Sequence, residues 1–193
     1  MIPEPGAATT SRRMILSRSG AGIAAGAALA LGGCGSSSNL PNVRKISPQA
    51  RSVDVEILNG LLDLEYKAIA AYTAGIPLLT SHVQTAARQF LSQEITHAGE
   101  LYGLIKQARG IANKRQASYA FGRPRGHKDV IELLHRLEQA EIAGYLDAIP
   151  NVSPGSVRAA LAAILANDAQ HVVVLRRALR VEPIPAPFVT GGE

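Results

Sequence analysis

Cysteine, long apolar runs and strong net charge are all scarce in this chain of 193 residues. Its only cysteine is Cys34, so no disulfide can form within the chain. The apolar run at residues 20–31 is too short for a helix that crosses a bilayer core of about 30 Å. The formal net charge is +5, of which residues 1–33 contribute +2 and the rest only a scattered +3. This weak positive charge gives no support for a nucleic-acid function.

The N-terminal segment has the pattern of an export signal. Residues 11–16 (Ser-Arg-Arg-Met-Ile-Leu), with Arg12 and Arg13, resemble a twin-arginine motif, and residues 31–34 (Leu-Gly-Gly-Cys) resemble a lipobox. We therefore expect residues 1–33 to be a leader and Cys34 to carry a lipid at the start of a tether, residues 34–50. The alternative is an uncleaved transmembrane anchor.

This leader predicts where the protein acts. Export by the twin-arginine route would place a lipoprotein in the cell envelope, facing the periplasm or the outside, with the membrane as a partner through the lipid. By resemblance to known leaders of this type, we expect the chain to be exported already folded, which would suit a protein whose metals are loaded in the cytoplasm.

The same pattern of potential ligand residues occurs twice in the chain. A lone glutamate is followed about thirty residues later by a carboxylate and, three residues on, a histidine: Glu65 with Glu94 and His97, then Glu138 with Asp168 and His171. The surrounding residues repeat as well, since residues 64–77 align without a gap on residues 137–150. The repeat predicts two helical hairpins, each of which carries half of one site.

Apolar spacing predicts an all-α fold. Helices are expected at about residues 52–75, from 81 to before 110, at about 127–149, and from an N-cap at Ser153 to about 179. Ser81 and Gln84 have the spacing of a capping box. The segment 110–126 lacks a helical period and is long enough to connect the two hairpins along the length of the bundle. The predicted domain covers residues 51–180, and a tail, residues 181–193, is expected to be extended against it or disordered.

Helical geometry places the repeated carboxylates in one layer. Glu65 falls on an apolar stripe with Leu62 and Ile69, so its side chain points to the core. In a hairpin, residues equidistant from the turn lie at the same height, and the turns expected near residues 79 and 153 are the midpoints of the two carboxylate pairs. The same spacing brings the two histidines to this layer.

Buried carboxylates need compensating charge. Desolvation costs several kcal/mol for each ion, and neighbouring carboxylates repel one another. Two divalent metal ions would supply four positive charges, and two neutral imidazoles would add ligands. Carboxylate with imidazole suits iron or manganese, and zinc also accepts it. The alternative is that these residues are surface carboxylates and hydrogen-bonded core histidines.

With these motifs, residues 53–179 resemble the ferritin-like superfamily, in particular its exported bacterial members, which are related to bacterioferritin, rubrerythrin and manganese catalase. The resemblance implies a four-helix bundle of two antiparallel hairpins joined by a long crossover. It also implies roles for the repeated residues: terminal ligands Glu65 and Glu138, bridging ligands Glu94 and Asp168, and capping ligands His97 and His171.

Asp168 departs from the family pattern, which usually has glutamate at this position. Its shorter side chain puts full occupancy of the second metal in question. Glu141 is an alternative or assisting ligand on the helix of Glu138, although the internal repeat aligns it with Ala68 and so favours Glu138.

Tyr72 and Tyr145 each lie seven residues after a predicted ligand glutamate, two turns along the same face. Their hydroxyls could hydrogen-bond ligands of the facing helices or carry an electron. The alternative is a buried tyrosine with one satisfied hydroxyl. The other histidines are expected at the surface: His82, His127 and His135.

The predicted function is a centre of two metal ions, iron by preference, that reacts with oxygen or peroxide as a ferroxidase, peroxidase or oxidase. Alternatives are a dimanganese catalase, a protein that binds metal without turnover, and a structural bundle with a vestigial site. The chain lacks the Cys-x-x-Cys pair of a rubrerythrin-type electron-transfer domain. A lipid anchor argues against a large soluble storage cage, and a homodimer is left open.

Overall fold

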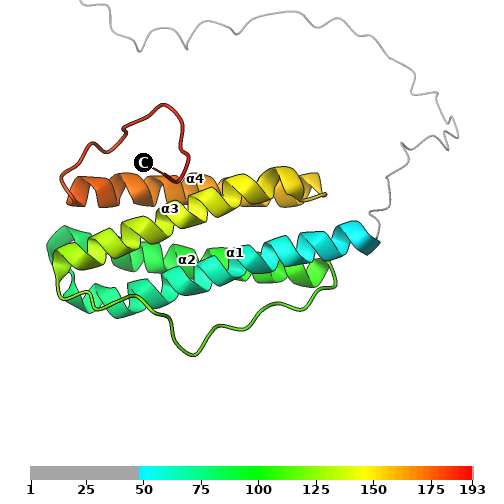
Figure 1. Cartoon of the computed structure of the whole chain (residues 1–193), viewed down its shortest axis with the longest axis horizontal. Helices are drawn as coiled ribbons and strands as arrows, with labels where there is room; N and C mark the ends of the chain where they lie inside the picture. Colours follow the sequence, from blue (N-terminus) through cyan, green and yellow to red (C-terminus); the bar gives the residue numbers. More distant parts are fainter. Residues whose placement is uncertain (1–47, 193) are drawn as a thin grey trace, which may run out of the picture. The chain divides into compact units, whose positions relative to one another are not determined.

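A computed structural model of the chain describes residues 48–192, whose regular elements are all helical. Four long helices, α1 (Pro48–Gly75), α2 (Ser81–Gln107), α3 (His127–Asn151) and α4 (Gly155–Ala178), form a bundle, with a short 3-10 turn, η1 (Ile76–Leu78), between the first two (Figure 1). The predicted all-α four-helix bundle is confirmed. No helix within residues 48–192 combines the length and apolarity needed to span a membrane. The predicted leader and Cys34 lie outside the described residues.

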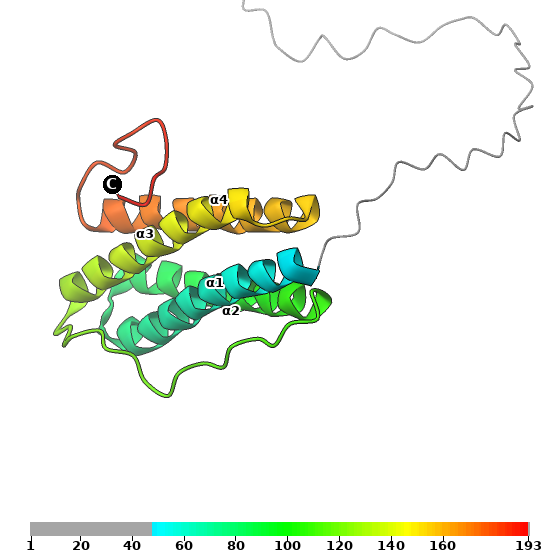
Figure 2. The ribbon, with the colours of Figure 1, turned by 45° about the vertical axis from the view of Figure 1, so that its right-hand side comes forward.

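The helices form two hairpins, α1 with α2 and α3 with α4, which pack together through α1 against α3 and α2 against α4. The long crossover from α2 to α3 runs along the outer side of the first hairpin (Figures 1 and 2). Asn59 of α1 holds it there: its Nδ2 donates to the carbonyl of Ile111 at 2.9 Å, and its Oδ1 accepts from the backbone N–H of Asn113 at 2.7 Å. The crossover therefore takes the path that the sequence predicted.

The core consists of two apolar clusters of buried side chains. One cluster includes Leu62, Leu101 and Leu161, and the other includes Leu134 and Leu175. Full burial of such a side chain stabilises the fold by about 1.5–3 kcal/mol. Along each helix, the predicted ligand positions fall between residues of the two clusters, so apolar layers cover the polar layer on both sides.

Several predicted helix ends differ from the observed ones. Helix α1 begins at Pro48, four residues before the expected start, because proline is well accommodated in the first turn of a helix. Ser153 is not the N-cap of α4; Pro154 occupies that position. The backbone N–H of Ser153 instead donates to Oδ1 of Asp54 at 2.8 Å, which ties the second hairpin turn to α1.

The expected capping box at the start of α2 is not formed, and no side-chain hydrogen bond caps this helix. The amide Nε2 of Gln84 donates to the carbonyls of Ile76 and Leu79, at 3.0 and 3.2 Å. Ile76 begins the preceding turn η1 and Leu79 follows it, and their carbonyls bind the glutamine side chain that the capping box would use. Helix α3 also runs two residues beyond Ile149, through Pro150, which costs it one backbone hydrogen bond in the last turn.

The C-terminal tail folds back over α3 and α4 (Figure 1). Its start is held by Arg176, whose Nε donates to the carbonyl of Glu182 at 2.6 Å. Near its end, Gly191 has φ +78°, and a Cβ at this position would lie 2.4 Å from the carbonyl oxygen of Gln139. Only glycine allows this close approach to α3.

Candidate metal centre

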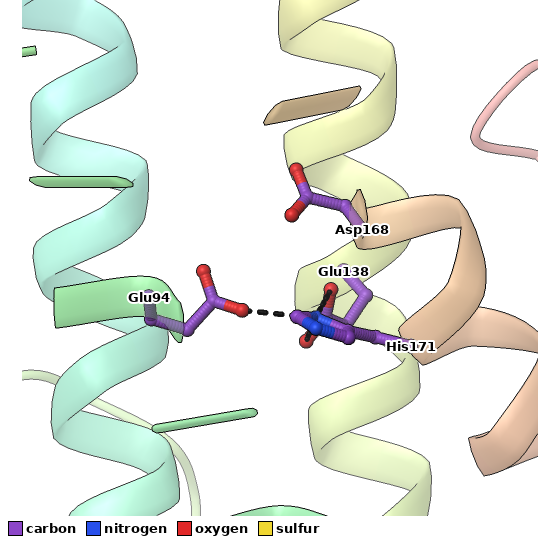
Figure 3. Close-up of side chains that lie close together, drawn as sticks. All are labelled: Glu94, Glu138, Asp168 and His171. Carbon is purple, nitrogen blue, oxygen red and sulfur yellow. Dashed lines mark hydrogen bonds and ion pairs between the residues drawn. The ribbon is translucent and has the colours of Figure 1, made fainter. Parts of the chain in front are cut away.

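All the ligand positions predicted from the sequence meet in the core. Exposure is 0–1% for Glu65, Glu94, Glu138, Asp168 and His171, and 8% for His97. Each helix contributes: α1 carries Glu65, α2 carries Glu94 and His97, α3 carries Glu138, and α4 carries Asp168 and His171. Figure 3 shows the side chains of α2, α3 and α4 converging on one another. Their action as metal ligands stays a prediction, as do the roles of Cys34, Arg12 and Arg13 outside the described residues.

Potential ligand atoms fall into three overlapping groups, two of which contain a histidine. In one, Glu94, Glu138, Asp168 and His171 each offer an atom within 4.8 Å of the others, and in the second, Glu65, His97 and Asp168 do the same. Asp168 belongs to both of the groups that contain a histidine. The shorter side chain at this position therefore still reaches both halves of the layer.

Glu94 connects the two histidines. Its Oε2 lies 3.3 Å from Nδ1 of His97, and its Oε1 lies 3.0 Å from Nδ1 of His171. The two imidazole rings are nearly parallel, with an interplanar angle of 22° and centroids 6.4 Å apart. One carboxylate oxygen thus faces each imidazole, which is the arrangement needed for a carboxylate that bridges two metal ions.

Gln93 fixes the orientation of His171, and the sequence did not reveal this. Nε2 of His171 lies 2.8 Å from Oε1 of Gln93, so Nε2–H donates and Nδ1 is directed at the carboxylates of Glu94 and Glu138. Phe90 stacks on the ring with centroids 4.0 Å apart. Partners of this kind commonly set the tautomer and orientation of a metal-binding histidine.

Replacing Gln93 by leucine should weaken the metal position at His171 by about tenfold to a hundredfold, because Nε2–H loses its acceptor. Competition titrations of the metal-loaded protein against a chelator measure this affinity. Gln89→Leu, an exposed position one turn away on α2, is the matched control and should leave both metals unchanged. Equal affinities in the two variants would show that Gln93 does not position the ligand.

The two buried tyrosines each hydrogen-bond a predicted terminal ligand on the facing helix. The hydroxyl of Tyr72 in α1 donates to Glu138 in α3, and the hydroxyl of Tyr145 in α3 donates to Glu65 in α1. Both rings are fully buried. The pair follows the internal repeat and orients Glu65 and Glu138 across the interface between the hairpins. Of the roles considered for the two tyrosines, the structure shows the hydrogen bond to a carboxylate of the facing helix.

Glu141 also lies in the polar layer. It is 1% exposed, and neither of its carboxylate oxygens has a hydrogen-bond partner in the described part of the chain. It offers an oxygen within 4.8 Å of ligand atoms of Glu65 and Glu94. From the sequence, Glu141 is an alternative to Glu138 or an assisting ligand, and the structure places both side chains in the layer.

Burial shifts the ionisation of the carboxylates. It raises the pKa of Glu65 and Glu141 well above the usual value, helped by neighbouring carboxylates. Burial, with the charges of Glu138 and Glu94, raises the pKa of Asp168 to about 9. For Glu138 burial also raises the pKa, although the hydrogen bond with His171 opposes it.

Glu94 and His171 form the charged pair of the metal-free layer. Burial alone would raise the pKa of Glu94, but hydrogen bonds with His171 and His97 outweigh it and hold the pKa at about 2. Burial likewise opposes the charge of His171, and its contacts with Glu138 and Glu94 overcome this and raise its pKa to about 10. Without metal, protons therefore supply the positive charge that this layer requires.

The chemistry of the site fits divalent metal ions. One oxygen of Glu65 and both oxygens of Asp168 and Glu141 are buried without a hydrogen-bond donor among residues 48–192. Orphaned carboxylate oxygens are costly unless a cation or proton compensates them. Together with two imidazoles, they make the donor set that iron and manganese accept.

The remaining histidines lie outside the layer. His82 is exposed, and Nδ1 of the half-buried His127 accepts the backbone N–H of Thr80 at 3.3 Å. His135 is half-buried, like His127. It lies four residues after Ile131 and three before Glu138, and this spacing places it at the edge of the buried stripe of α3.

Comparisons with known proteins agree with this geometry. The sequence pattern of a ferritin-like domain matches residues 53–181. A conserved hypothetical protein of Mycobacterium tuberculosis shares the fold with a TM-score of 0.65 at 19% identity, over 72% of this chain and 99% of that one. A protein of Bacillus anthracis strain Ames, named as ferritin-like and diiron-carboxylate, has a TM-score of 0.59 at 19% identity, over 67% of this chain and 97% of that one. No curated protein matches the chain.

Proposed function

The chain belongs to the ferritin-like domain family, and from this premise we propose that its core binds two metal ions, iron by preference, in a centre that reacts with oxygen or peroxide. The observation that carries the proposal is the position of Glu94, which presents one carboxylate oxygen to each of the two buried histidines. Asp168 supports it, because this residue belongs to both of the groups that contain a histidine.

The two groups that contain a histidine define which residues would hold each ion. Glu65 and His97 would hold one ion, and Glu138 and His171 would hold the other. Glu94 and Asp168 would be shared between them. Glu141 would supply a further oxygen next to Glu65.

Bound metals would supply the redox change and the place where an oxidant binds. The protein contributes the surroundings of that chemistry. Apolar clusters on both sides of the layer exclude water, which strengthens every electrostatic interaction inside it. Tyr72 and Tyr145 hold Glu138 and Glu65 in place through hydroxyl hydrogen bonds, and each keeps its proton because burial, with the adjacent carboxylate charge, raises its pKa.

A dimanganese centre with catalase activity is the second candidate. Glu141 favours it, because a further carboxylate increases the share of oxygen donors, and manganese prefers oxygen ligands. Iron remains the first candidate because imidazole and carboxylate together suit it and because the Bacillus anthracis neighbour is named as a diiron-carboxylate protein.

Spectra of the protein loaded with iron(II) without oxygen, recorded before and after oxygen is admitted, test the first candidate. A di-iron centre should develop new near-ultraviolet absorption on oxidation. Oxygen release from hydrogen peroxide by the manganese-loaded protein would favour the second candidate. Protein that retains neither metal on desalting would contradict both.

We also propose that the chain is exported by the twin-arginine route and anchored through Cys34. The support is the motif at residues 11–16, the run at residues 20–31, and the tetrad that ends in the only cysteine.

Changing Arg12 and Arg13 together to lysine should leave folded precursor in the cytoplasm, and Cys34→Ala should leave unprocessed or unlipidated protein. Cell fractionation with immunoblotting measures both. Arg18→Lys, in the same segment but outside the motif, is the control and should be exported like the wild type. Unchanged export of the double variant, or unchanged processing and membrane association of Cys34→Ala, would contradict the corresponding part of the proposal.

A further inference from the structure

A surface pocket between α2 and α4 ends at the predicted metal centre. It has a volume of about 360 Å³, and its lining residues are Thr96, His97, Glu100, Ala160, Ala163 and Ile164. Thr96, Glu100 and Ala163 are exposed, whereas Ile164 and His97 are 5% and 8% exposed. The pocket therefore opens to solvent between exposed residues and reaches a predicted ligand at its base.

Small side chains keep this seam open. Two alanines of α4, Ala160 and Ala163, line the pocket opposite Thr96 and Glu100 of α2. A larger side chain at either alanine position would fill the pocket. Leu161, on another face of α4, is an example of a large side chain that is fully buried.

The two halves of the centre differ in their access to solvent. The side chain of His171 is 1% exposed, covered by Phe90 and hydrogen-bonded to Gln93. The side chain of His97 is 10% exposed, and its Nδ1 lies 3.8 Å from Glu65, 3.3 Å from Glu94 and 3.4 Å from Asp168. One edge of the His97 ring thus faces the carboxylates while the residue also lines the pocket.

We propose that this pocket, the α2–α4 inlet, is the route by which divalent metal ions reach the centre. This inference rests on the proposed metal-binding function. Glu100 is the acidic residue among those that line the inlet, and its charge raises the local concentration of cations at the opening. His97 then receives the ion at the base, beside Glu65, Glu94 and Asp168.

Ala163→Phe tests the inlet, because position 163 is exposed and a phenyl ring there can be accommodated without repacking the core. The probe is cobalt(II) alone, mixed rapidly with the metal-free, full-length chain and followed by its visible absorption. The rate of cobalt binding should fall by about tenfold, which corresponds to an activation free energy higher by about 1.4 kcal/mol. The final amount of cobalt bound should stay the same. Ala162→Phe is the matched control, since position 162 is exposed on the same helix but does not line the inlet.

Glu100→Gln provides a second, independent variant. It should slow loading at low ionic strength, and the difference from the wild type should disappear in high salt, because salt screens the attraction. Ala163→Phe that loads as fast as Ala162→Phe would overturn the inlet while the metal centre stands. Wild-type protein that binds no cobalt would instead contradict the proposed metal centre itself.

Discussion

Replacing Glu65 and Glu138 together by glutamine should abolish metal binding and, at the same time, raise the melting temperature of the metal-free protein at pH 8. The amide oxygens can still accept the hydroxyl hydrogen bonds of Tyr145 and Tyr72, so the shape of the layer is kept. Burial raises the pKa of both carboxyl groups, so their contribution to the stability of the folded state falls as the pH rises above the ordinary carboxyl range. Glutamine is neutral at every pH and avoids this loss, and we expect a gain of roughly 5 °C.

The matched control also removes one negative charge from α1 and one from α3, but at surface positions. Glu56 of α1 is exposed, and Glu132 of α3 makes only a surface ion pair of 3.6 Å with Lys128. Changing both to glutamine should leave metal binding intact and shift the melting temperature by no more than about 3 °C, since such pairs contribute about 0–1 kcal/mol. Calorimetry after chelation, with metal content measured on the same samples, provides the comparison. A site variant that keeps its metal, or melts no higher than the control, would mean that these carboxylates do not share a buried layer.

The metal-free wild type should lose stability as the pH rises from 5 to 9, with a fall in melting temperature of about 10 °C. Asp168, with a folded pKa of about 9 against an ordinary 3.8, favours the folded state fully below pH 3.8, and this advantage is lost as the pH rises through 9. His171, with a pKa of about 10 against 6.5, acts in the same direction between these values. Glu94, with its pKa lowered to about 2, acts oppositely, but only where the pH falls below its ordinary 4.5.

Bound metal should reverse this dependence, because protons compete with it for the same oxygens. Metal at a hundredfold excess over its dissociation constant adds about 2.7 kcal/mol for one site. The difference in melting temperature with and without chelator should therefore be largest near pH 9 and shrink towards pH 5. A metal-free protein that is more stable at pH 9 than at pH 5 would contradict the protonated, buried layer.

Most of the polar layer could be predicted from the sequence because helical spacing determines direction. Once Glu65 and Glu138 fall on apolar stripes, Tyr72 and Tyr145 at seven residues' distance must lie on the same faces. The internal repeat then relates the two hairpins, and the structure brings each tyrosine to the glutamate of the facing helix.

Contacts between different helices could not be predicted in this way. Gln93 lies beside the apolar stripe of α2, and only the rotation of α2 against α4 brings it to His171. Likewise, Asp54 binds the backbone of Ser153, 99 residues away in the chain. Rules for helix capping use only neighbouring residues, so they cannot predict a contact between Ser153 and a residue so far away in the sequence. The internal repeat aligns Glu141 with Ala68, so it did not predict a carboxylate at this position. The burial of Glu141 depends on the packing of α1 against α3.

The most direct test of the dinuclear centre is the ratio of iron to protein in the full-length chain, loaded without oxygen and then desalted. The wild type should retain about two irons per chain, the number that a bundle with this ligand set binds. His97→Ala and His171→Ala should each retain about one, because each change removes the imidazole of one metal position. No iron in the wild type, or the same ratio in all three proteins, would contradict a centre built from Glu94, Asp168 and these two histidines.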